Sequence, residues 1–254
     1  MSGRTMNGPG EPTRNPPAAR CHGVTKTYGR GNAAVQALRG VDLEVRAGEL
    51  LMLAGPSGCG KTTLISVLAG LLQRDGGECS VLEHDYMRMS LNETTRFRKR
   101  NIGFVFQSFD LIPALTAAEN VATPLLINGL KRQAALERAG ALLRMMGFDD
   151  RMLRSLPAEL SGGQQQRAAI ARALVHDPRL IVCDEPTSAL DSENGHAVMG
   201  LLRRFALGKE RMLVVVTHDD RIFEFADVIA RMEDGRIVRV EKTPRRVNEP
   251  QRDA

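Results

Sequence analysis

The chain carries two kinds of hydrophobic pattern, and each kind predicts a different element. Short apolar runs bounded by glycine, proline or charged residues predict strands, and they lie at residues 24–28, 35–45, 50–54, 78–82, 102–106, 180–183, 212–216, 228–230 and 237–238. Helical composition or spacing predicts helices at residues 63–70, 92–100, 117–127, 134–146, 162–175 and 192–207. Strands and helices that alternate in this way predict an α/β fold, with a mixed sheet core and an antiparallel β edge.

One long stretch interrupts this alternation. Residues 113–160 contain no strand pattern, and Thr116 with Glu119 three residues later is typical of the start of a helix. We therefore expect an inserted helical subdomain at about residues 113–165. It is smaller than a free domain, so we expect it to belong to a single domain spanning residues 21–242.

Both ends of the chain have a different composition from the body. Residues 1–20 are rich in glycine, proline and arginine without any periodicity, which predicts a disordered N-terminal tail. Residues 243–254 predict a basic C-terminal tail. The net charge of the chain is +5, and the two tails contribute +2 and +1 of it, which leaves +2 for the body. That charge is too small to indicate nucleic acid as a partner.

Composition narrows the class of protein further. Apolar residues make up 43% of the 254 positions, which is ordinary for a globular protein with one core. No apolar run approaches the ~18 residues that span a membrane, and no signal peptide is evident, so we expect a cytoplasmic chain. The cysteines are Cys21, Cys59, Cys79 and Cys183. They form no C-x-x-C pair, so the sequence indicates neither a zinc site nor a disulfide framework.

A glycine-rich loop between a strand and a helix carries the first candidate chemistry. The loop matches G-x-x-x-x-G-K-[ST], a pattern expected by chance in only about 1% of chains of this length. Its glycines allow backbone N–H groups to face a phosphate chain, and Lys61 can reach the β- and γ-phosphates while the Thr62 hydroxyl can bind Mg²⁺. The residues that we expect to hold the nucleotide here are Gly55, Pro56, Ser57, Gly58, Cys59, Gly60, Lys61, Thr62 and Thr63.

A second motif lies at the end of another predicted strand. Residues 180–183 are apolar and are followed by Asp184 and Glu185. A carboxylate at such a strand end, beside a phosphate-binding loop, can hold Mg²⁺ through water, so we expect Asp184 to be a metal ligand. Glu185 would then polarise the water that attacks the γ-phosphate.

The stretch Leu160-Ser161-Gly162-Gly163-Gln164-Gln165-Gln166-Arg167 resembles the LSGGQ signature of ABC ATPases. The other motifs of that family follow in order around it. Tyr28 lies where the family stacks an aromatic ring on adenine, Gln107 resembles the glutamine of the Q-loop, and His218 resembles the switch histidine. Residues 188–191, which end in Asp191, resemble the D-loop. The resemblance covers about residues 21–240 and implies a P-loop NTPase fold of the ABC ATPase type.

The resemblance implies a mechanism and a partner. In that family two nucleotide domains enclose two ATP molecules head to tail, so we expect a second copy of this chain as a partner. The nucleotide of one copy would be contacted by the signature of the other, and the residues concerned here are Ser161, Gly162, Gly163, Gln164 and Asp191. Glu185 and His218 would be catalytic, and Gln107 would contact the metal or the attacking water. ATP and Mg²⁺ are the implied cofactors.

A finer resemblance concerns the stretches outside the active site. Residues 104–121 are similar to the macrolide-export and lipoprotein-release branch, and residues 217–235 are also similar to glycolipid-export members. Those relatives power an integral-membrane permease from the inner face of the inner membrane and act on lipidic or amphipathic substrates. The alternative is an ABC ATPase that regulates a membrane partner mechanically without transport, as in cell division. A ribosome- or DNA-directed ABC protein usually has two cassettes or a long coiled coil, which are absent here.

The loop after Gln107 is unusually apolar. Residues 108–115 include Phe109 and Leu111, and we expect this loop to dock the permease. The alternative is that these residues only pack the helical subdomain onto the core.

Overall fold

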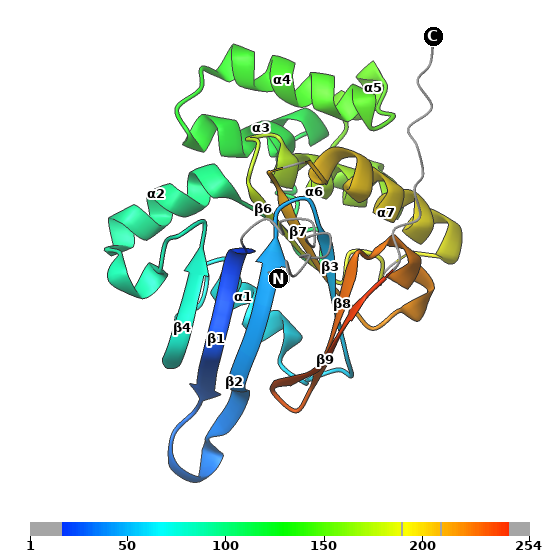
Figure 1. Cartoon of the computed structure of the whole chain (residues 1–254). Helices are drawn as coiled ribbons and strands as arrows, with labels where there is room; N and C mark the ends of the chain where they lie inside the picture. The colour runs from blue at the N-terminus through cyan, green and yellow to red at the C-terminus, as the bar shows by residue number, and fades with distance from the viewer. Residues whose placement is uncertain (1–16, 189, 209, 244–254) are drawn as a thin grey trace, which may run out of the picture.

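The computed structural model describes residues 17–188, 190–208 and 210–243. In it, two sheets flank a helix, and a group of helices lies at one end (Figure 1). The first sheet is antiparallel, has the order β2-β1-β4, and consists of β1 (Pro17–Tyr28), β2 (Val35–Arg46) and β4 (Gly76–Val81). The second sheet has the order β5-β6-β7-β3-β8-β9. Its strands are β3 (Leu50–Ala54), β5 (Ile102–Val105), β6 (Leu180–Asp184), β7 (Met212–Thr217), β8 (Val228–Glu233) and β9 (Arg236–Lys242).

The second sheet is parallel except for its last strand, which pairs with β8 in the antiparallel sense. All five residues of β3 and all six of β7 are buried, which explains their continuous apolar runs. Alternate residues enter different cores. Leu50 and Met52 belong to the core under the helical end, whereas Leu51 and Leu53 belong to the core shared with the antiparallel sheet. The sheet is therefore covered on both faces.

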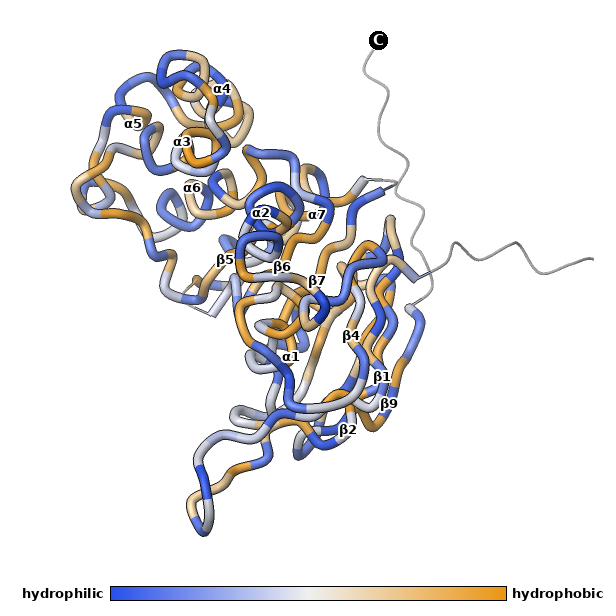
Figure 2. Tube along the Cα trace, turned by 90° about the vertical axis from the view of Figure 1, so that its left-hand side faces the viewer, coloured by the Kyte–Doolittle hydropathy of each residue, from blue (hydrophilic) through white to orange (hydrophobic). Residues whose placement is uncertain are grey.

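The helices divide between those two faces. They are α1 (Lys61–Leu68), α2 (Leu91–Asn101), α3 (Ala117–Ile127), α4 (Arg132–Met145), α5 (Asp150–Arg154), α6 (Gly162–Leu174) and α7 (Ser192–Ala206). The 3₁₀ helices are η1 (Gly31–Ala33), η2 (Tyr86–Arg88), η3 (Pro157–Glu159) and η4 (Asp220–Phe225). Helix α1 contacts strands of both sheets, while α3, α4 and α6 pack on one another. Figure 2 shows β6 and β7 largely hydrophobic and α2 and α4 with hydrophilic stretches.

The helical subdomain begins where the sequence predicts. Thr116 caps α3 in a capping box with Glu119, and both reciprocal hydrogen bonds are present. Helices α3, α4 and α5 form the end of the molecule farthest from the antiparallel sheet (Figure 1). The short helix α5 has no sequence counterpart among the predictions, because its single turn is too brief for a periodic pattern. No helix in the described residues is long and apolar enough to cross a membrane.

The predicted start of the domain is wrong by four residues. Strand β1 begins at Pro17, because Ala19 is only 1% exposed and pairs with Val45 on one side and Val81 on the other. At the other end, β9 ends at Lys242. The remainder of the two predicted tails, residues 1–16 and 244–254, lies outside the described residues.

Candidate active site

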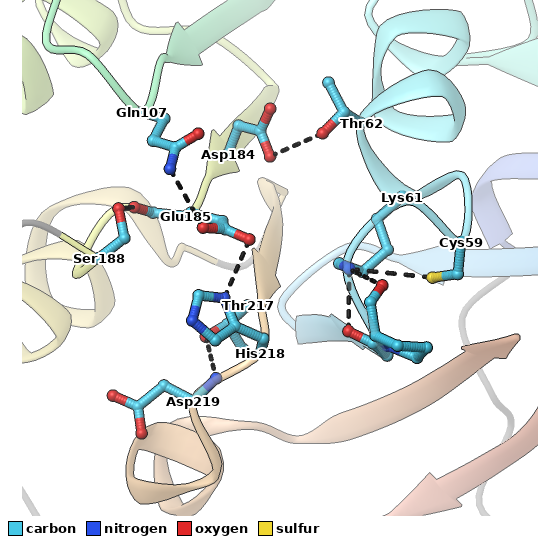
Figure 3. Close-up of polar contacts among 12 residues, drawn as sticks. Cys59, Lys61, Thr62, Gln107, Asp184, Glu185, Ser188, Thr217, His218 and Asp219 are labelled. Atoms are coloured by element: carbon cyan, nitrogen blue, oxygen red, sulfur yellow. Dashed lines mark hydrogen bonds and ion pairs between the residues drawn. The ribbon is translucent and has the colours of Figure 1, made fainter.

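The candidate residues gather at one edge of the parallel sheet. The phosphate loop follows β3, Gln107 follows β5, Asp184 ends β6 and His218 follows β7. Because parallel strands share a direction, their carboxyl ends meet at the same edge, which is where ligands bind in open α/β sheets. Figure 3 shows that the side chains of Gln107 and His218 both point toward Glu185.

The glycines of the phosphate loop are required by the close approach of other segments. A Cβ on Gly60 would lie 2.4 Å from the carbonyl oxygen of Ala37, and one on Gly55 would lie 2.1 Å from that of Met232. Both glycines also have positive φ angles, of 106° and 156°. The loop is therefore held between β2 and β8, with its backbone free to face a ligand.

Lys61 opens α1 and is only 5% exposed. Its ammonium donates to the carbonyl oxygens of Gly55, at 2.9 Å, and Pro56, at 2.7 Å, so it lies folded over the loop (Figure 3). The N-terminus of α1 has no side-chain cap and no acidic residue in its first turn. Unpaired N–H groups and a positive dipole end beside a cation form a site suited to phosphate.

Asp184 and Thr62 supply oxygen ligands next to that site. The Thr62 hydroxyl donates to Asp184 Oδ1 at 3.2 Å. Burial raises the pKa of Asp184, and the neighbouring charge of Glu185 raises it further, while the Thr62 hydrogen bond acts in the opposite direction. A half-buried carboxylate of this kind is stabilised as an anion by a cation, and carboxylate with hydroxyl oxygen suits Mg²⁺. The residues present therefore fit a magnesium ion.

Glu185 is the centre of the polar contacts. Gln107 Nε2 donates to its Oε2 at 3.3 Å, and His218 Nδ1 lies 3.0 Å from its Oε1. Its backbone has a φ of 49°, a left-handed conformation that is uncommon for a residue with a side chain. The backbone N–H of Glu185 donates to the carbonyl of Val216 at 3.0 Å, which holds this strained turn against β7.

Two adjacent pockets share the Glu185 side chain. One, of about 280 Å³, is lined by the phosphate loop together with Gln107, Asp184 and Glu185. The other, of about 230 Å³, is lined by Glu185, Ser188, His218 and the residues that follow it. The sequence missed Ala37, which lines the first pocket from β2, because an alanine in a strand gives no chemical signal.

The remaining candidates lie around these pockets or away from them. Tyr28, at the end of β1, is 45% exposed, and its hydroxyl lies 3.5 Å from Thr63 Oγ1, so it is beside the phosphate loop. Asp191 caps α7 by accepting from the backbone and side chain of Asn194. The signature residues 161–164 line neither pocket. They open α6, where Ser161 and Gln164 form a capping box with each other.

A larger and more apolar groove of about 470 Å³ lies between the sheet and the helical end. Its exposed apolar walls include Phe106, Ile112 and Ile127, and Lys99 and Arg172 also line it. The loop expected to dock the permease, residues 108–115, contributes Ile112 to this groove. Leu111 of the same loop packs against the core instead, and it follows two residues with positive φ angles, 109 and 110. The sequence does not single out Ile127, because the position of a residue in the last turn of a helix does not indicate whether its side chain is exposed.

Comparisons with known proteins agree with this geometry. A family model described as ABC transporter matches residues 38–188. The lipoprotein-releasing system ATP-binding protein LolD of Hyphomonas neptunium is 41% identical over 223 residues, which cover 87% of this chain and 97% of that protein. The macrolide export ATP-binding/permease protein MacB of Brucella melitensis is 40% identical over 235 residues, which cover 92% of this chain and 36% of that longer protein.

A solved structure is similar over nearly the same length. It is the dimeric, post-hydrolysis state of the ATP-binding cassette MJ0796, from Methanocaldococcus jannaschii, bound to ADP and Pi. The TM-score is 0.81 at 39% identity, and the match covers 88% of this chain and 98% of that one. The family match, the identities and the common fold together show that this chain is an ATPase that belongs to the ABC transporter ATP-binding proteins, in the branch of LolD and MacB.

Proposed function

We propose that the chain powers an inner-membrane exporter or extractor of lipidic or amphipathic substrates, by closing as a dimer around ATP. The observation that carries the catalytic part is the set of contacts around Glu185, which joins Gln107 and His218 beside the phosphate loop. The relatives LolD and MacB bear names that refer to lipoprotein release and macrolide export. Both names describe amphipathic cargo, which supports the substrate class.

In this proposal each residue of the pocket has one task. Lys61 and the N-terminus of α1 bind the β- and γ-phosphates, and Tyr28 stacks on the adenine. Glu185 orients and polarises the attacking water, while His218 contacts the γ-phosphate and holds the geometry of attack. Thr62, Asp184 and Gln107 hold Mg²⁺, which when bound supplies positive charge to the phosphate oxygens. The rate enhancement comes from positioning and electrostatics, because phosphoryl transfer needs little covalent chemistry from the protein.

The signature residues supply the second half of the site in this proposal. Residues 161–164 are absent from the walls of the pocket that contains the phosphate loop of their own chain. A second copy, placed head to tail, would bring its Ser161 and Gly163 to the γ-phosphate, with Asp191 at the same interface. The MJ0796 cassette, which has the same fold, is dimeric in its ADP-bound and Pi-bound structure. ATP would then hold two chains together, and hydrolysis would release them.

Replacing Glu185 with Gln tests the catalytic residue and the dimer together. The amide keeps the shape of the side chain and removes its basic carboxylate, so we expect hydrolysis to fall by about 10²–10⁴-fold while ATP binding is retained. Steady-state phosphate release measures hydrolysis, and light scattering with and without ATP measures the ATP-dependent dimer. The variant should be a dimer with ATP and a monomer without it.

A matched control is available on the antiparallel sheet. Glu78→Gln makes the same chemical change at an exposed position of β4 outside the pocket, and it should leave both measurements unchanged. A Glu185→Gln protein that hydrolyses ATP at the normal rate would remove this residue from catalysis. A Glu185→Gln protein that stays monomeric in ATP would contradict the proposed dimer around ATP.

The apolar groove is the candidate docking site for the permease. Its walls are largely apolar, and Arg98, Lys99 and Arg172 outnumber Asp110 among the charged residues that line it. The loop that forms one wall begins at Gln107 in the nucleotide pocket. A partner helix with an apolar face and an acidic side chain fits these properties. The chain would then lie on the inner face of the membrane, attached through its permease, and ATP-dependent changes near Gln107 would reach the groove directly.

Replacing Ile127 with Arg tests the docking site. Ile127 is 57% exposed at the end of α3, so the charge should not disturb folding or the basal ATPase rate. We expect it to abolish co-purification with the permease and any permease-dependent change in ATPase rate. Leu91→Arg, at an 80% exposed position outside the groove, is the matched control. Normal co-purification of Ile127→Arg with the permease would show that the docking site lies elsewhere.

A further inference from the structure

Two of the four cysteines lie opposite each other in the antiparallel sheet. Cys21 on β1 and Cys79 on β4 are direct partners in the strand register, although 58 positions separate them in sequence. Their sulfur atoms are 3.6 Å apart, and both thiols are free. Directly opposed residues of an antiparallel pair have Cα atoms about 4.5–5.5 Å apart, which lies within the range that disulfides span. The register of the two strands is therefore compatible with a disulfide between these residues.

The pair is also chemically asymmetric. The Cys21 thiol donates to the Cys79 sulfur, and this hydrogen bond lowers the pKa of Cys79, as does the charge of Arg74, while burial acts against both. The same hydrogen bond and burial raise the pKa of Cys21. Arg74 is fixed in place because its guanidinium forms two hydrogen bonds of 2.8 Å with the Asp85 carboxylate. Cys79 is therefore the more reactive of the two sulfurs, and Cys21 is the second thiol, placed to react with Cys79 after its oxidation.

We propose that Cys21 and Cys79 form a peroxide-sensitive disulfide that locks β1 to β4. The Cys79 thiolate attacks one oxygen of hydrogen peroxide, and the O–O bond breaks. Hydroxide departs, and Cys79 becomes a sulfenic acid. The Cys21 sulfur then attacks the Cys79 sulfur, the S–O bond breaks, and the departing hydroxide takes up the thiol proton as water. Two thiols and one peroxide thus give one disulfide and two waters.

Burial restricts which oxidants can react. Cys21 is 2% exposed and Cys79 is 1% exposed, so a water-sized peroxide reaches them during small openings of the sheet, whereas a bulky disulfide does not. The new bond would tie β1, which ends at Tyr28 beside the phosphate loop, to β4, which follows α1. The lock would tie together β1, which reaches the phosphate loop through Tyr28, and β4, which contacts α1, without adding any group to the pocket.

The test uses the unaltered, full-length protein treated with graded hydrogen peroxide. Free thiols are alkylated after denaturation, and tryptic peptides are analysed by mass spectrometry. Trypsin places each cysteine in a peptide of its own, so a linked pair of peptides identifies the two cysteines. The four peptides are residues 21–26, 47–61, 75–88 and 180–203. We expect peptides 21–26 and 75–88 to be linked with the loss of two hydrogen atoms, and to separate again in dithiothreitol.

Two further readouts separate a native lock from incidental oxidation. The oxidised protein should melt at least about 5 °C higher than the reduced one, because the bond closes a long loop in the unfolded chain. In Cys21→Ser, whose hydroxyl can still donate to the Cys79 sulfur, Cys79 should accumulate sulfenic and sulfinic acids. In Cys79→Ser, whose hydroxyl can still accept from the Cys21 thiol, Cys21 should stay reduced. Cys183→Ala, at a fully buried cysteine of β6, is the control that should still form the linked peptide.

The outcomes against the proposal are equally distinct. Absence of the 21–26 to 75–88 linkage in the folded wild-type protein overturns it, as does equal linkage of any other cysteine pair. A melting temperature that falls on oxidation shows that the bond distorts the sheet, and it overturns the lock. Rapid oxidation of Cys21 in Cys79→Ser overturns the assignment of Cys79 as the attacking sulfur.

Discussion

The N-terminus of α1 and the N-terminus of α6 are both suited to phosphate, but the structure treats them differently. Helix α1 begins after Gly60 with no side-chain cap and with a cation, Lys61, at its first position. Helix α6 begins after Ser161, whose hydroxyl accepts from the backbone N–H of Gln164, and the Gln164 side chain accepts from Ser161 in return. The first helix end is open toward its own pocket, whereas the second is stable without a ligand.

In the proposed dimer, this difference would let one chain hold two anion sites with separate tasks. The open end of α1 has no side-chain cap, so its N–H groups are available to a bound anion. The capped end of α6 has two of its N-terminal donors paired and still leaves Gly162 and Gly163 without side chains that would exclude an approaching phosphate. In the proposed dimer, α1 therefore holds the nucleotide and α6 of the other copy only completes the site. Changes at the two ends should consequently have different effects on binding and on assembly.

The largest effect is expected from Lys61→Ala at the open end. The ammonium is the cation nearest the phosphate loop, and a charge-assisted contact to the transferring phosphate is worth at least about 10²–10³ in rate. We expect fluorescent ATP analogues to bind at least about tenfold more weakly and ATPase activity to become undetectable. Dimer formation in ATP should also be lost, because the nucleotide is no longer held.

Lys131→Ala is the control for that variant. Lys131 is an exposed lysine before α4, outside both pockets around Glu185. Its replacement should leave nucleotide affinity and hydrolysis unchanged. Unchanged affinity and activity in Lys61→Ala would instead remove the open end of α1 from the nucleotide site.

The sequence predicted the elements of the parallel sheet more accurately than the shape of the site. Continuous apolar runs identify β3, β6 and β7, because strands buried on both faces are apolar along nearly their whole length, and only the last residues of β6 and β7 are polar. The start of β1 was missed because Pro17 and the alanines after it have low strand preference, and only pairing with strands on both sides orders them. Tertiary partners decide such a boundary, and the local sequence does not contain them.

Side-chain placement shows the same limit. Motifs identified Glu185, but its left-handed backbone and its two contacts depend on the turn being held by Val216 of another strand. The Cys21 and Cys79 pair follows from the strand register alone, so their spacing in sequence gave no signal. Motif residues can be predicted when chemistry restricts the residue type. Contacts between distant segments require the fold.

A smaller but more selective effect is expected from Gly163→Asp at the capped end. An added Cβ would lie 3.6 Å from the Asn194 side chain, which is an ordinary contact, so the monomer should fold. An acidic residue in the first turn of a helix adds about 0.3–1 kcal/mol of stability through the helix dipole. The same carboxylate would repel the γ-phosphate brought by the second copy. We therefore expect a monomer that melts slightly higher, binds the ATP analogue normally, and neither dimerises in ATP nor hydrolyses it at more than about a hundredth of the normal rate.

Gln133→Asp separates the two consequences of that charge. Gln133 is exposed and is the second residue of α4, as Gly163 is of α6, so the new carboxylate has the same relation to a helix dipole. Its carboxylate would face Glu137 four residues later, in place of the present hydrogen bond from Gln133 to Glu137, so the melting temperature should change little. ATP-dependent dimerisation and hydrolysis should stay intact. If Gly163→Asp still dimerises and turns over ATP normally, α6 does not face the nucleotide of a second copy. Loss of ATP-analogue binding by the isolated Gly163→Asp monomer would mean that the two helix ends serve the same nucleotide, and the contrast between them would fail.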